Sequence, residues 1–307
     1  MKPYTCLALI LMLASRALAQ TNLPPYEWKA TMKVVDEGGN PLSGVNADIG
    51  YFVHSQPADA KGLTDTNGIF EFSHATRSTI AEVGLQAEKA GYYTTMMRRE
   101  LGPKYSPFEW IFTQTLLLKK IGNPTAMYAR WVNENPPALG KPIGYDLTLG
   151  DWVAPNRKGV TSDIFFQKDA YRNSGNDYEY KVKVTFPKSG DGIQVYTVQP
   201  FEIGSAFRSP HLAPTDGYQS AIAKERSAHP GQATKNDDDP KRIYLFRVRT
   251  ILDDKGNIVS AQYGKIYGDF MQFRYFLNPT PNDLNVEFDP RHNLLGGLKS
   301  FEQVTEP

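Results

Sequence analysis

The residues best suited to bind a ligand lie in the second half of the chain. Arg247 and Arg249 are two residues apart in an extended segment, so we expect them to share one face of a strand. A guanidinium group there can fork hydrogen bonds to a carboxylate or to sugar hydroxyls. Trp152 stands between Gly150-Asp151 and Val153-Ala154-Pro155, and an aromatic loop residue can stack on a sugar ring. These residues indicate binding rather than a reaction centre.

Each candidate also has a purely structural interpretation. The two arginines can pair with acidic neighbours across strands, and Trp152 can belong to a core or a domain interface. His211 lies in the proline-rich segment of residues 209–214, where it can be an exposed binding residue or an ordinary loop histidine. The exposure of each side chain separates these interpretations.

Motifs for covalent or metal chemistry are absent from the sequence. No histidine lies in His-Glu-x-x-His or in a His-x-x-Glu pair, and there is no Gly-x-Ser-x-Gly segment and no glycine-rich phosphate loop. The single cysteine, Cys6, cannot form an internal disulfide. We therefore expect no metal and no cofactor. A glycosidase stays open, because its two carboxylates need no fixed spacing in sequence.

The elements that would position the candidates read as strands. Residues 178–186 alternate apolar and polar side chains, and Tyr244, Phe246, Val248 and Leu252 give residues 243–252 one apolar face. Residues 253–257 form a turn to a following strand at 258–260, and residues 270–277 are apolar on one face. The only helix that the spacing predicts covers residues 218–228.

The first third of the chain has a sequence pattern typical of a β-sandwich. Short apolar runs at residues 32–35, 45–51, 69–72, 83–87 and 110–118 alternate with Gly, Asn, Asp and Pro turns. Phe70 and Phe72 should face one side of their strand. We expect Asp36 and Asp65 to accept backbone N–H groups within their own turns rather than to bind calcium, which needs several converging oxygen ligands.

Three segments in this region follow a known pattern. They are Val35-Asp36-x-x-Gly39-Asn40-Pro41-Leu42-x-Gly44-Val45, then Thr64-Asp65-x-x-Gly68-x-Phe70, then Ala90-Gly91-Tyr92. Over residues 28–120 the chain resembles the carboxypeptidase regulatory-like domain. That resemblance implies a seven-stranded transthyretin-like sandwich acting as an accessory module, and it brings no catalytic residue with it.

The domain organisation follows from these patterns. We expect a signal peptide at residues 1–19, the sandwich at 20–120, a Pro/Gly-rich linker at 121–143 and a second β-rich domain at 144–307. The fold class is therefore mostly all-β, with an Ig-like or transthyretin-like sandwich first and at most one short helix.

The N-terminus indicates export. Lys2 precedes an apolar run from Cys6 to Ala14, and Ala17-Leu18-Ala19 is a cleavage pattern. Cleavage removes Lys2 and Arg16, which changes the net charge of the chain from +1 to −1. We expect a periplasmic or extracellular protein with no membrane span. A nearly balanced charge without a basic run disfavours nucleic acid as a partner.

Three functions fit the sequence. Export, an accessory-type sandwich and an aromatic content of 4 Trp, 17 Tyr and 16 Phe favour a non-catalytic binding or surface-interaction protein. A glycan is its favoured ligand, and an envelope or extracellular protein is the other expected partner. The alternatives are a polysaccharide hydrolase that uses carboxylates of the second domain and a purely structural envelope protein. The aromatics equally suit the cores of two β domains.

Overall fold

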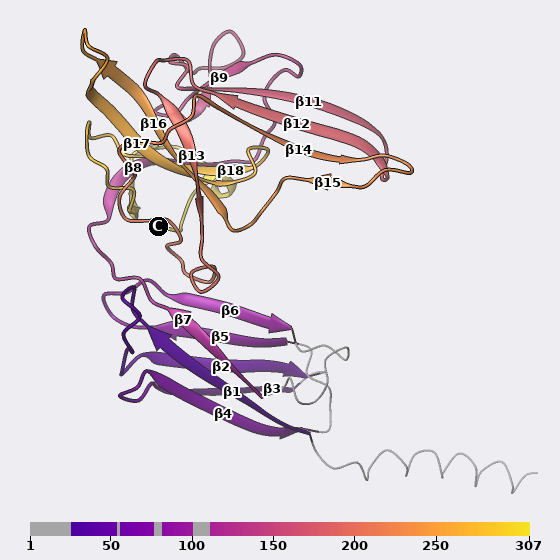
Figure 1. Ribbon diagram of the computed structural model, residues 1–307, viewed down its shortest axis with the longest axis vertical. Coiled ribbons are helices and arrows are strands. Elements are labelled where there is room, and N and C mark those ends of the chain that lie inside the picture. Colours follow the sequence, from indigo (N-terminus) through magenta and orange to yellow (C-terminus); the bar gives the residue numbers. More distant parts are fainter. Residues whose placement is uncertain (1–25, 54–55, 77–81, 101–110) are drawn as a thin grey trace, which may run out of the picture. The chain divides into compact units, whose positions relative to one another are not determined.

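The computed structural model describes residues 26–53, 56–76, 82–100 and 111–307, and the expected signal peptide lies outside them. The chain divides into two compact units, Met1–Lys120 and Ile121–Pro307. Strands make up nearly all of the regular structure in the described residues, which confirms the all-β fold class (Figure 1). The short 3-10 helix η2 (Ser300–Glu302) is the helical element among them. None of the described segments is a helix with the length and hydropathy to cross a membrane.

The described strands of the first unit form a β-sandwich. One sheet has the order β4-β1-β7, in which β1 is antiparallel to β4 and parallel to β7, and the other has the antiparallel order β3-β2-β5-β6. The strands are β1 (Tyr26–Val35), β2 (Asn46–Val53), β3 (Gln56–Leu63), β4 (Ile69–Thr76), β5 (Glu82–Glu88), β6 (Thr95–Glu100) and β7 (Ile111–Leu117).

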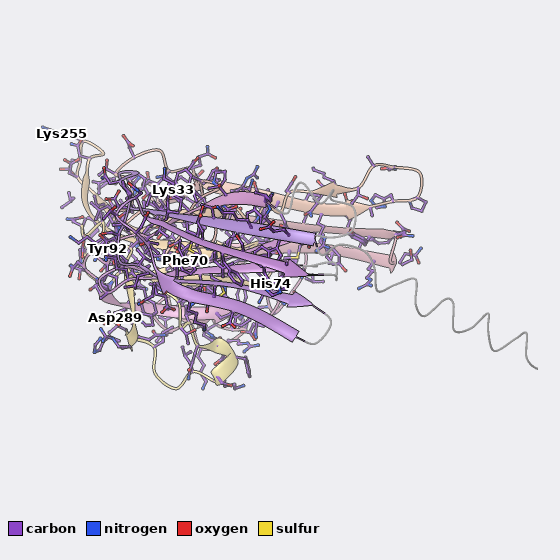
Figure 2. All side chains as sticks on the ribbon, turned by 90° about the horizontal axis from the view of Figure 1, so that it is seen from below. Lys33, Phe70, His74, Tyr92, Lys255 and Asp289 are labelled. Atoms are coloured by element: carbon purple, nitrogen blue, oxygen red, sulfur yellow. The ribbon has the colours of Figure 1, made fainter. Side chains whose placement is uncertain are left out.

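Alternation of side chains builds the core of this sandwich. Val83, Leu85 and Ala87 of β5 are buried, while the residues between them face outward. Trp28 of β1 packs edge-to-face against Phe72, with ring centroids 5.3 Å apart. Phe70 and Phe72 both pack on the core, as their spacing predicted, and Figure 2 labels Phe70 on β4.

Two turns of the first unit, each between a strand of one sheet and a strand of the other, depend on aspartate side chains. Asp36 Oδ1 accepts the N–H groups of Gly38 and Asn40, at 2.9 and 2.8 Å. Asp65 Oδ1 accepts those of Asn67 and Ile69, at 2.9 and 2.8 Å. The expectation that these carboxylates serve their own turns is confirmed.

The second unit contains two sheets with six described strands each. Their orders are β10-β9-β11-β12-β14-β15 and β13-β16-β17-β18-β8-β19. The strands are β8 (Thr125–Val132), β9 (Ile143–Asp146), β10 (Asp151–Trp152), β11 (Ile164–Ser174), β12 (Asp177–Thr185), β13 (Gly192–Thr197), β14 (Ala221–Ala228), β15 (Lys235–Asn236), β16 (Arg242–Leu252), β17 (Ile258–Gly268), β18 (Phe273–Leu277) and β19 (Phe288–Asn293).

A large apolar core joins the two sheets of the second unit. Val182 and Val184 of β12 contribute to it from one sheet, and Tyr244, Phe246 and Val248 of β16 contribute from the other. The opposite face of the second sheet carries further buried clusters, which include Leu245 and Phe276. The apolar faces expected for residues 178–186 and 243–252 thus lie mainly in the core.

Two sequence expectations are corrected in this unit. The segment expected to be a linker at residues 121–143 contains β8, which pairs with β18 and β19 inside a sheet. Most of the helix expected at 218–228 is strand β14, residues 221–228, which pairs with β12 over its whole length. Its residues, Ala-Ile-Ala-Lys-Glu-Arg-Ser-Ala, have good helix propensity, but pairing with a neighbouring strand overrides that weak preference.

The predicted hairpin of β16 and β17 is present. Asp253 Oδ1 accepts the N–H groups of Lys255 and Asn257, at 2.9 and 2.7 Å, and Gly256 has a φ of +82°. Figure 2 labels Lys255 in this turn. The turn around Asp36 has the same Asp-centred hydrogen bonds, which run to Gly38 and Asn40.

Candidate functional site

Trp152 is a core residue. It is 1% exposed and packs edge-to-face against Tyr145 and Phe166, with ring centroids 4.9 and 5.7 Å away. The expectation that it stacks on a sugar ring is wrong, because neither face of its ring is open to a ligand. The structural interpretation, a core tryptophan, is the one the structure has.

Arg247 is also buried, at 8% exposure. Its Nε donates to the carbonyl of Gly190 at 2.7 Å and its Nη1 to that of Thr215 at 2.8 Å. The guanidinium lies over the ring of Tyr218. These donors tie two connecting segments to β16, so the side chain acts as a brace and the expected ligand contact is corrected.

Arg249 also serves the structure. It lies at a bulge of β16 with a φ of +57°, which explains why it does not share a face with Arg247. Its Nε and Nη2 form a bidentate pair with Asp163 at 2.8 and 3.0 Å, and Nη2 also donates to Thr148 Oγ1. The hydrogen bond to Asp163 raises the pKa of Arg249 above its usual range. The guanidinium group of Arg249 thus donates its hydrogen bonds to side chains of the protein.

The carboxylates around Arg249 are fixed as well. Burial raises the pKa of Asp146, but hydrogen bonds from the N–H of Thr161, from the Thr148 hydroxyl and from the N–H of Val160 outweigh burial and lower it. Asp163 accepts the N–H of Leu147 besides the arginine. The lowered pKa of Asp146 suits a structural network and does not suit a general acid.

His211 contacts buried groups of its own unit. Its Nδ1 lies 3.1 Å from Glu287 Oε2, and its ring lies 4.8 Å from that of Phe207. Glu287 also accepts the N–H groups of Gly122 and Asn123, at 2.9 and 2.8 Å. The histidine thus belongs to a network that anchors the start of the second unit.

A surface that the candidates did not include lies on the first unit. Two adjoining cavities of about 450 and 480 Å³ share Asp48 and Gln86 and run over the outer face of the β3-β2-β5-β6 sheet. We call this surface the glycine trough. Its lining includes Asp48, Gly50, Asp59, Lys61, Leu63, Glu82, Gly84, Gln86, Glu88, Met96 and Arg98.

Two glycines form the floor of the trough. Gly50 of β2 and Gly84 of β5 are direct partners across the two central strands. In the same row, Gly50 pairs with Asp59 of β3 and Gly84 pairs with Arg98 of β6. The two edge side chains are therefore three strand spacings apart, roughly 14 Å, with bare backbone between them.

The space above these glycines is open. A Cβ at Gly50 would lie 3.7 Å from Asp59 Cβ, and one at Gly84 would lie 3.8 Å from the Gly50 carbonyl oxygen, both ordinary contacts. Neither residue has a positive φ. Packing and backbone geometry thus do not require glycine there. Glycine inside a strand weakens it and often marks a close approach of a ligand.

The walls carry paired charges and two apolar side chains. Lys61 Nζ lies 2.9 Å from Asp48 Oδ2, and Arg98 Nε lies 3.5 Å from Glu82 Oε1. The hydrogen bond to Asp48 raises the pKa of Lys61, which stays protonated at neutral pH. Leu63 and Met96 are 63% and 51% exposed. The trough offers a flat floor, apolar edges, and hydrogen-bond donors and acceptors.

The sequence contained a signal for this surface. Gly50 and Gly84 each interrupt a run of strand-forming residues, and an isolated glycine in a strand indicates a bulge or a close approach of another group. What the sequence alone does not give is the register, which makes the two glycines neighbours.

The described residues contain no cluster of three or more His, Cys, Asp or Glu that could hold a metal ion.

Comparison with known proteins gives distant likenesses. No family model matches the chain, and no curated protein matches it. Among solved structures, a streptococcal ancillary pilin is 13% identical with a TM-score of 0.23, over 80% of this chain and 60% of that one. The major pilin subunit BcpA of Bacillus cereus is 10% identical with a TM-score of 0.23, over 87% and 97%. The bacterial integrin-binding protein invasin is 12% identical with a TM-score of 0.18, over 82% and 54%. TM-scores this low do not establish a shared fold.

Proposed function

We propose that the protein is an exported, non-catalytic binding protein that holds a carbohydrate chain in the glycine trough. The observation that carries the proposal is the pairing of Gly50 with Gly84 at the centre of an outward-facing sheet. A Cβ added at either glycine would make only ordinary contacts, yet both positions leave the backbone bare. Ligand contact accounts for that choice.

The chemistry of the lining favours a sugar. A pyranose ring has C–H faces that pack on a flat floor and hydroxyl groups around its edge. The ion-paired Lys61 and Arg98, their carboxylate partners and Gln86 supply donors and acceptors at that edge. The lining has four carboxylates, Asp48, Asp59, Glu82 and Glu88, against two cations. The trough therefore favours neutral or basic sugars over acidic ones.

Other features of the chain agree with an accessory binding role. The N-terminal segment has the order of a secretory signal peptide, which would bring the protein to extracellular or envelope glycans. The resemblance of residues 28–120 to the carboxypeptidase regulatory-like domain implies a module without catalytic residues, and a two-sheet sandwich suits it. An envelope protein remains the alternative partner.

The test uses residues 20–307 and a panel of neutral oligosaccharides of hexoses and N-acetylhexosamines, measured by glycan array and then by calorimetry. We expect Gly84→Val to lower the affinity at least tenfold, because the valine fills the floor. Its Tm should not fall. The matched control is Ser73→Val, an exposed position on β4 of the other sheet, which should bind like the wild type.

Three results would overturn the proposal. Unchanged binding by the Gly84→Val variant would place the ligand elsewhere, and absence of binding across the panel would favour a structural or protein-partner role. Release of shortened oligosaccharides would support the hydrolase instead.

A further inference from the structure

A further cavity, in the second unit, differs from the glycine trough in charge, because its lining has more cationic than acidic side chains. It has a volume of about 370 Å³ and lies at one end of β16, β17 and β18. Four cationic side chains from different segments line it, namely Arg208, Lys224, Arg242 and Arg274. We call this cavity the arginine pocket. All of its lining residues lie in the second unit.

Two of these arginines lie against aromatic rings. The guanidinium carbon of Arg208 is 5.0 Å from the ring centroid of Tyr267, and that of Arg274 is 4.7 Å from the ring centroid of Trp131. Ring contact restrains a guanidinium group while leaving its N–H donors available in its own plane. Among the described residues Arg208 makes no ion pair, and Arg274 has a loose one with the half-exposed Glu306 at 3.6 Å.

Two of the carboxylates in the lining, Asp269 and Asp239, accept hydrogen bonds from backbone N–H groups. Asp269 Oδ1 accepts the N–H groups of Met271 and Gln272 at 2.9 and 3.0 Å. Asp239 Oδ1 accepts the N–H of Lys241 at 2.9 Å, and its Oδ2 lies 3.5 Å from Arg242 Nε. Their negative charge is thus partly satisfied by amides, whereas no carboxylate in the described part of the chain forms an ion pair with Arg208.

Lys224 adds a buried charge to the same place. Its side chain is 7% exposed, with Nζ 5.1 Å from the ring centroid of Tyr244 and 5.6 Å from that of Phe270. Its carboxylate neighbour, Asp238, is 3.6 Å away, longer than a hydrogen bond. A cation held this far from water is stabilised further by a bound anion.

We propose that the arginine pocket binds an oxyanion carried by a small ligand, such as the carboxylate of a uronic acid or the sulfate ester of a sugar. Arg208 and Arg274 supply fork-shaped donors, and Lys224 and Arg242 add charge at the base and the rim. The inference does not rest on the glycine trough, which lies in the other unit and favours ligands without negative charge.

The experiment titrates residues 20–307 with glucuronate, with galactose 6-sulfate and with inorganic sulfate. Binding is followed by calorimetry and by the rise of Tm with ligand concentration. We expect Arg208→Gln and Arg242→Gln each to weaken binding about tenfold or more, as loss of a charge-assisted hydrogen bond does. Arg208→Lys should recover only part of the affinity, because an ammonium cannot fork. The affinity should also fall with added NaCl.

Arg157→Gln is the matched control for Arg242→Gln. Both arginines are 45% exposed, and Arg157 pairs with Glu134 outside the pocket. It should bind like the wild type. Arg242 is itself about half exposed, so its variant tests the pocket even if Arg208→Gln destabilises the unit.

Tighter binding of glucuronate identifies a carboxylate ligand, and tighter binding of galactose 6-sulfate identifies a sulfate ester. If inorganic sulfate matches both, the sugar part of the proposal is wrong. Absence of binding by all three probes, or binding that survives in both Gln variants, would overturn the proposal.

Discussion

The glycine trough and the arginine pocket create binding surfaces by opposite means. In the trough, two strands lack side chains at neighbouring positions, so the backbone itself becomes the floor. In the pocket, long cationic side chains from four segments converge at the ends of strands. The first depends on strand register and the second on how loops meet a sheet. Their charges also differ, and the two surfaces should therefore select different ligands.

The largest expected effect concerns an arginine outside both surfaces. Arg249→Leu leaves Asp163 buried without its bidentate partner, and we expect a loss of about 3–5 kcal/mol in the free energy of unfolding. Urea denaturation measures it, with Arg157→Leu as the exposed control. A loss below about 1 kcal/mol would remove the distinction between structural arginines and those of the pocket.

Two glycines on the same sheet should respond oppositely to enlargement. A Cβ at Gly62 would lie 2.5 Å from Phe70 Cε2 on the core side, so Gly62→Val should cost about 1–3 kcal/mol. Gly84→Val should leave stability unchanged or raise it by up to about 1 kcal/mol. Thermal unfolding compares the two variants. Equal losses would show that Gly84 is needed for packing, which would undercut the trough.

Acid should weaken the network beside Arg249. Hydrogen bonds lower the pKa of Asp146 below its unfolded value, so this group stabilises the fold above about pH 4 and loses its contribution as the pH falls through the lower, folded pKa. Burial raises the pKa of Asp191, so ionisation of this group lowers the stability of the fold as the pH rises. We expect Asp146→Asn to flatten the acid limb of a stability–pH curve measured by urea denaturation. An unchanged acid limb would contradict this assignment.

The smallest effect is expected at the trough walls. Lys61 is largely exposed and Asp48 is partly exposed, so Lys61→Gln should change the free energy of unfolding by less than about 1 kcal/mol. The same variant should weaken oligosaccharide binding by a few fold, because one donor to the sugar edge changes. Parallel calorimetry and thermal unfolding separate the two quantities. A large loss of stability without loss of affinity would make the pair structural.

The sequence predicted local features well and their assembly poorly. The turn functions of Asp36 and Asp65 and the shared face of Phe70 and Phe72 depend on neighbouring residues, and all are present. Strand β14 was expected to be a helix because its pairing with β12 is a long-range contact that propensity does not contain. Likewise, β8 was expected to be a linker because its partners lie near the C-terminus.

The candidate site residues failed for a related reason. Trp152 and Arg247 have side chains that often bind ligands, yet in this fold they fill a core and brace two segments. Composition cannot distinguish these uses, since both require the same atoms. The trough was missed because its signal is the absence of side chains at two positions brought together by register.

The pairing of β8 has a consequence for the order of folding. This strand opens the second unit, yet Val132 pairs with Phe273, about 140 residues later in the chain. Contacts so distant in sequence form slowly, because a long loop must close first. The first unit has its last strand by residue 117 and needs no such wait. During synthesis β8 therefore lacks its partners β18 and β19 until the final strands of the second unit emerge.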